Sequence, residues 1–160
     1  MIKNILTALI ASAVALPSLA ASQADINRLT ALIEETGTTV AHEKCQEGIN
    51  GYYHFDSEKK IDKLAICTTG TDMQDTNSYW ETLAHEATHV MQACVGGPVM
   101  KSTWHPRLVR ELKSDAPHYW AIIDNSYGSD DRLVEIEAFW MELQTPSDVV
   151  TAFTMSCFKE

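Results

Sequence analysis

Basic residues are scarce in this sequence: 12 Lys and Arg stand against 22 Asp and Glu in 160 residues, giving a formal net charge of −10. A surface this acidic repels phosphate groups, which argues against nucleic acid and anionic membranes as partners. Glycine (7) and proline (5) are also few, and no low-complexity tract, internal repeat or linker interrupts the chain. These absences argue against a disordered or fibrous protein and favour one packed domain.

Long apolar runs are absent as well, except near the N-terminus. There, Lys3 precedes an apolar run from Ile5 to Leu16, and small residues stand at Ser18 and Ala20. This pattern predicts a secretory signal peptide at residues 1–20, cleaved after Ala20. The alternative, an uncleaved membrane anchor, is disfavoured because a bilayer span needs about 20 apolar residues. We therefore expect a secreted or periplasmic protein whose mature domain is 21–160, with no membrane span after cleavage.

The chain has four cysteines but no C-x2-C pair, which argues against a cysteine-based zinc site. An even number of cysteines in an exported protein indicates disulfides, here in one of three connectivities. Cys45–Cys67 is favoured because two short strands joined by a turn lie between them. Cys94–Cys157 would then join the C-terminal segment to a central helix.

Apolar periodicity indicates an α+β domain, mostly helical with a small β-hairpin or sheet. Strands are expected between residues 38 and 68, with a polar turn at 56–60. A helix is expected to begin at Ser78, because Glu81 follows at the spacing of a capping box. The helices are predicted over 24–36, 78–94, 106–113, 117–126, 130–144 and from 146 onward.

The strongest helical pattern contains His85-Glu86-Ala87-Thr88-His89, which is an H-E-x-x-H motif. Residues four apart lie on one helix face, so the two imidazoles can share one Zn²⁺ at about 2.0–2.1 Å. Glu86 is rotated off that line, where it can take the proton of a zinc-bound water. The other residues of 82–91 are uncharged, as a helix buried behind a metal site requires.

Residues 82–91 resemble the extended motif of the zincin metallopeptidases at every position. Metzincins are excluded, because Gln92 and Val95 stand where their glycine and third histidine would fall. The resemblance implies a zinc metallopeptidase in which His85 and His89 bind the metal. It also implies that Glu86 is the general base and later the acid in peptide-bond hydrolysis.

Glu137 is the predicted third metal ligand. On a helical wheel it flanks an apolar stripe, whereas Glu135 points nearly opposite, toward water. A carboxylate beside apolar packing is costly unless a cation compensates its charge, and zinc would do so. The Glu137-Ala138 step also resembles the third-ligand segment of gluzincins, including compact minimal ones. The stripe consists of Leu133, Ile136, Trp140 and Leu143.

Other residues remain open as the third ligand, among them Glu135. Asp124 begins a D-x-x-Y-G stretch similar to the aspzincin signature, although the preceding Gly-Thr is missing. His105 and His118 are histidines that could ligate, or could donate a hydrogen bond to the oxyanion of the reaction. Tyr127 has the same possible donor role.

The sequence thus predicts an exported zinc metallopeptidase of gluzincin type, acting as a monomer on peptide or protein substrates. One alternative is a zinc-binding module without turnover, although such a module has no use for Glu86. Another is a zinc amidase that hydrolyses a non-protein amide. The segment Tyr52–Phe55 could hold an extended substrate by backbone pairing, although packing of its aromatic residues in the core is favoured.

Overall fold

The computed structural model describes residues 20–129 and 131–158. In this part of the chain, six α-helices, one short 3-10 helix and three strands form a mostly helical α+β domain, which confirms the predicted class. The predicted signal peptide lies outside the described residues except for Ala20. None of the helices described has the length and apolar content of a membrane span. In chain order the elements are α1 (Gln23–Glu35), β1 (Thr39–Glu43), β2 (Gly51–Asp56), β3 (Ile61–Cys67), α2 (Thr76–Val95), η1 (Ser102–Trp104), α3 (His105–Asp115), α4 (Pro117–Ser126), α5 (Arg132–Glu142) and α6 (Pro146–Cys157).

The sheet has the strand order β1-β3-β2. β2 and β3 form the antiparallel hairpin expected from the sequence, whereas β1 pairs with β3 in parallel. β2 is therefore an edge strand. The predicted Cys45–Cys67 disulfide is confirmed, and it joins the segment after β1 to the end of β3.

The central helix α2 begins two residues before the expected start. The side chain of Asp75 caps the helix by accepting a hydrogen bond from the backbone N–H of Asn77. Ser78 instead uses its hydroxyl to accept a hydrogen bond from the backbone of Asp72 at 3.2 Å. The predicted capping box at Ser78 is therefore wrong, because an aspartate three residues earlier satisfies the free N–H groups of the first turn.

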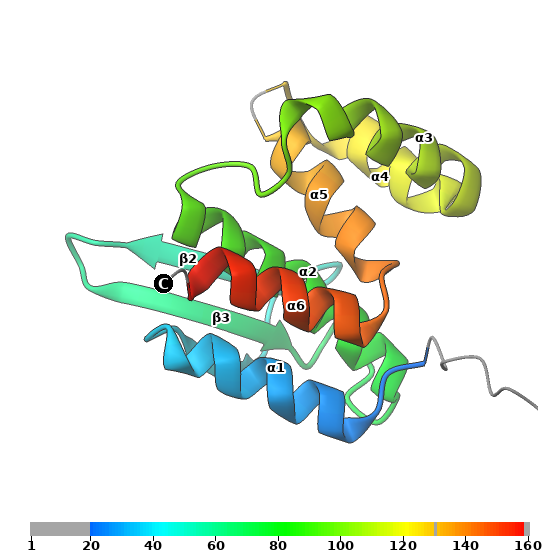
Figure 1. Ribbon diagram of the computed structural model, residues 1–160. Helices are drawn as coiled ribbons and strands as arrows, with labels where there is room; N and C mark the ends of the chain where they lie inside the picture. Colours follow the sequence, from blue (N-terminus) through cyan, green and yellow to red (C-terminus); the bar gives the residue numbers. More distant parts are fainter. Residues whose placement is uncertain (1–19, 130, 159–160) are drawn as a thin grey trace, which may run out of the picture.

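Two apolar clusters meet at α5. The main cluster surrounds α2, which packs against α1, α6, the sheet and α5 (Figure 1). The second lies among α3, α4 and α5, which stand together at one end of the molecule in Figure 1. α5 supplies Met141 to the first cluster and Ile136 and Phe139 to the second. This helix is consequently buried on two faces rather than one.

The second predicted disulfide, Cys94–Cys157, is also confirmed. It joins the last turn of α2 to the last residue of α6. Because α6 packs along α2, the bond fixes the C-terminal helix against the central one. Both disulfides are compatible with an oxidising, extracellular location.

Candidate metal centre

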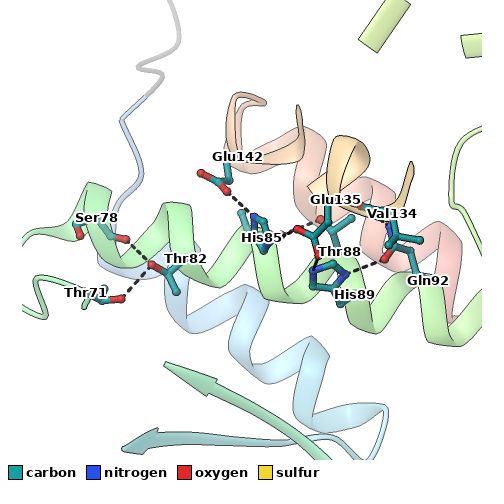
Figure 2. A network of polar contacts seen from close by, with 11 residues as sticks. Thr71, Ser78, Thr82, His85, Thr88, His89, Gln92, Val134, Glu135 and Glu142 are labelled. Atoms are coloured by element: carbon teal, nitrogen blue, oxygen red, sulfur yellow. Dashed lines mark hydrogen bonds and ion pairs between the residues drawn. The ribbon is translucent and has the colours of Figure 1, made fainter. Parts of the chain in front are cut away.

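His85 and His89 lie one turn apart on α2 and face Glu135 of α5. Figure 2 shows the carboxylate of Glu135 between the two imidazoles. Its Oε2 is 3.4 Å from His85 Nε2, and its Oε1 is 3.5 Å from His89 Nε2. One ligand atom from each of these three residues lies within 4.8 Å of the others, so the group could hold a metal ion.

The contacts of Glu135 are compatible with metal ligation. Zinc bonds of ~2.0–2.1 Å at tetrahedral angles place neighbouring ligand atoms ~3.3 Å apart. Two different oxygens of Glu135 make the contacts with the two histidines, at 3.4 and 3.5 Å, and each contact taken separately is close to that value. Glu135 is only 9% exposed, and its buried Oε2 accepts no hydrogen bond from the described residues. A buried carboxylate oxygen without a donor is costly, and a cation at this position would compensate it.

The Nδ1 atoms of both imidazoles have hydrogen-bond partners, so the Nε2 atoms are the ones that face Glu135. His85 Nδ1 donates to Glu142 Oε1 at 2.6 Å, because a carboxylate can only accept. His89 Nδ1 donates to Gln92 Oε1 at 2.8 Å. Both Nε2 atoms therefore face Glu135, and each could offer a lone pair to a metal, which at His85 would first have to displace the proton on Nε2.

The charges around the histidines favour a cation. Burial acts to lower the pKa of His85, but the neighbouring carboxylates of Glu135 and Glu142 outweigh it and raise the pKa to about 10. Burial, together with the nearby His85, lowers the pKa of His89. The two carboxylates thus stabilise one positive charge at His85, and a metal ion would compete with that proton.

Glu86 lies on α2 beside the metal group, with 5% of its surface exposed. Burial raises its pKa to about 7; the nearby His85 opposes this, and Glu135 and Glu142 add to it. A carboxyl group poised near neutral pH can both accept and return a proton. Glu86 lines a cleft of about 480 Å³, together with His85, Tyr119 and Tyr127.

A second cavity, of about 390 Å³, also borders the metal group. It is lined by His89 and Glu135, whereas the first cleft is lined by His85 and Glu86. Tyr127 lines both cavities. The candidate metal centre therefore borders two cavities.

No family model, curated protein or solved structure matches this chain.

The structure corrects the expectation for Glu137, since it places Glu135 at the histidines instead. Glu137 is 1% exposed, and its carboxylate accepts hydrogen bonds from the backbone N–H groups of Val99 and Met100 at 2.8 and 2.9 Å. Gln92 Nε2 and His105 Nε2 also lie within 3.1 Å of its oxygens. These donors compensate the buried charge, so no metal is needed there.

The helical wheel failed because it assumed that α5 has one buried face. Both Glu135 and Glu137 are buried, one toward α2 and the other toward the segment that precedes α3. A spacing signal was nevertheless present: Glu135 and Glu142 are seven residues apart, or two helical turns, and so share a face. Sequence reasoning had assigned no role to Glu142 or to Gln92.

The remaining candidates take other places. Asp124 is an exposed partner of Arg132 at 3.1 Å. His105 is the first residue of α3, and its Nε2 lies 3.1 Å from Glu137 Oε1. His118 lines the first cleft beside Tyr119. Of the expected alternatives, only Glu135 joins the two histidines among the described residues.

Proposed function

We propose that this protein is an exported zinc metallopeptidase in which His85, His89 and Glu135 hold the metal. One observation carries the proposal: ligand atoms of three side chains converge within 4.8 Å of one another, and Glu86 lies beside them in an open cleft. Two histidines and one glutamate, with a fourth position left for water, form a donor set typical of catalytic rather than structural zinc. The absence of cysteine from the group also favours catalysis.

The chain supplies a proton carrier for amide hydrolysis. When bound, zinc would polarise a water molecule and the substrate carbonyl, lowering the pKa of the water toward about 7. Glu86 would take up the proton that the attacking water loses as its oxygen bonds to the carbonyl carbon. It then returns the proton to the amine nitrogen as the C–N bond breaks. Burial supports both roles, because it raises the pKa of Glu86 to about 7.

Tyr127 is a second residue that could support the same reaction. It follows α4 and lines both cavities. Burial, with the charge of Glu135, raises its pKa to about 12, so the hydroxyl stays protonated at neutral pH. We assign Tyr127 the role of a hydrogen-bond donor to the negative oxygen that develops on the substrate carbonyl.

The start of the edge strand β2 offers a place for an extended peptide. The residues from Gly48 to Gly51 line the first cleft. A Cβ on Gly51 would lie 2.9 Å from Glu86 Cγ and 2.8 Å from Thr82 Cγ2, so only glycine allows this strand to approach α2 so closely. Because β2 is an edge strand, its outer backbone groups are available to pair with a substrate.

The proposal is tested by zinc content and peptide cleavage measured on the same preparations. Wild type should bind about one zinc per chain and cleave a mixed peptide library. Glu86→Gln should keep zinc and lose cleavage, and Glu135→Ala should lose both. Glu58→Gln, in the turn after β2, is the matched control for charge removal. Zinc without turnover of any substrate would instead indicate a binding module, and an amide substrate outside proteins would indicate an amidase.

A further inference from the structure

The first cleft has acidic residues beyond those of the metal group. Glu81 of α2 and Glu142 of α5 both line it, in addition to Glu86. Its only basic candidates are His85 and His118, since no Lys or Arg occurs among the described residues that line it. His85 belongs to the metal group. The cleft therefore carries more negative charge than its own side chains compensate.

The acidic groups lie close enough to influence one another. Tyr119 of α4 lines the cleft, and burial together with the neighbouring carboxylates of Glu142 and Glu81 raises its pKa. Burial, Glu142 and Asp75 together raise the pKa of Glu81, whereas His118 and Tyr119 oppose that rise. A positive group entering here would relieve the repulsion between the carboxylates.

Apolar side chains line the same cleft. Ile49, in the loop before β2, is 38% exposed, and Ile122 of α4 is 43% exposed. They are two of only six large apolar residues exposed in the described part of the chain. Tyr119 and Phe139 add aromatic surface. Exposed apolar residues gathered in one cleft indicate a binding surface rather than chance exposure.

We infer that this cleft selects peptides with a lysine or arginine side chain next to the scissile bond. Such a side chain has an apolar stem, which Ile49, Ile122 and Tyr119 can cover, and a charged end, which Glu81 and Glu142 can bind. The formal net charge of −10 also attracts cationic peptides. The inference rests on the proposed peptidase function and specifies its substrate class.

The test compares fluorogenic peptides that differ only at the residue beside the scissile bond. Lysine, norleucine and glutamate are compared at that position, each with a free and an acetylated N-terminus. The kcat/KM of the lysine peptide should exceed that of the norleucine peptide at least tenfold, and the glutamate peptide should have a lower kcat/KM than either. Glu81→Gln should reduce the lysine preference about tenfold, whereas Glu58→Gln should leave it unchanged.

A binding measurement separates failure of the inference from failure of the proposed function. The zinc-loaded Glu86→Gln protein should bind the lysine peptide about tenfold more tightly than the norleucine peptide, and added Glu81→Gln should remove the difference. Equal affinity for the two peptides would overturn the inference even if the wild type cleaves both. A preference that follows only the free N-terminus would also overturn it. Selective binding of the lysine peptide, with no turnover by the wild type, would support the acidic cleft as a binding site for cationic side chains and would refute the peptidase.

Discussion

His89 Nδ1 donates a 2.8 Å hydrogen bond to Gln92 Oε1, one turn farther along α2. The amide nitrogen of Gln92 in turn donates to Val134 O at 3.0 Å and to Glu137 Oε2 at 3.1 Å. These two acceptors fix which end of the amide faces the imidazole. Gln92 thus joins a proposed metal ligand to the carboxylate that was first expected to be one.

Gln92→Leu should weaken zinc binding about 10–100-fold, because His89 would lose the partner that fixes its tautomer and ring orientation. Competition with a zinc-binding dye measures the change. Gln74→Leu, at an exposed glutamine before α2, is the control. Unchanged zinc affinity in Gln92→Leu would show that the hydrogen bond does not position the ligand.

Glu137→Gln should act on stability rather than on zinc. The new amide nitrogen would replace one of the two oxygens and would face the N–H group of either Val99 or Met100, where an acceptor is required. We expect a loss of about 2–4 kcal/mol in the free energy of unfolding, measured by urea denaturation with a chelator present. Zinc per folded chain should remain near that of wild type. If Glu137→Gln instead lost zinc while its free energy of unfolding stayed unchanged, Glu137 would be a metal ligand.

Zinc affinity should rise with pH. Since its neighbouring carboxylates raise the pKa of His85 to about 10, this imidazole is protonated at neutral pH, and zinc must displace one proton from it. The apparent Kd should therefore fall about tenfold per pH unit between pH 7 and 9. Titration in two buffers of different ionisation enthalpy should show about one proton released. A Kd independent of pH would contradict the assigned charge of His85.

Gly51→Val should reduce turnover about tenfold or more and leave zinc bound. The added side chain would collide with Thr82 and Glu86, so β2 or the base must move, and small displacements of a catalytic group are costly. Phe55→Val controls for the change in strand propensity, because Phe55 lies at the other end of β2 and is 58% exposed. Wild-type kcat/KM in Gly51→Val would show that this contact does not position Glu86.

The two disulfides should contribute unequally to stability. Replacing Cys94 and Cys157 with serine should lower the free energy of unfolding by about 4 kcal/mol, and replacing Cys45 and Cys67 by about 3 kcal/mol, because the longer loop restricts the unfolded chain more. The sequence separations are 63 and 22 residues. Urea denaturation of the two double variants provides the comparison, and a reversed order would mean that native-state packing outweighs loop entropy.

Local sequence patterns were sufficient to predict most of the secondary structure of this protein. The positions of the helices, the hairpin and both disulfide pairings were predicted from periodicity, turn residues and cysteine placement. His85 and His89 were placed on one face because four residues make about one helical turn, a relation that needs no knowledge of the rest of the fold. The parallel pairing of β1 with β3 was not predicted, since it joins segments that no turn connects.

The third member of the metal group was decided by tertiary structure alone. Glu135 and Glu137 stand two residues apart on the same helix, and either carboxylate would suit the chemistry. Their roles diverge because α5 lies between two apolar clusters, so that one side faces α2 and another faces the chain before α3. Sequence periodicity reports how apolar residues recur along a helix, whereas the partner of each face depends on how distant helices pack.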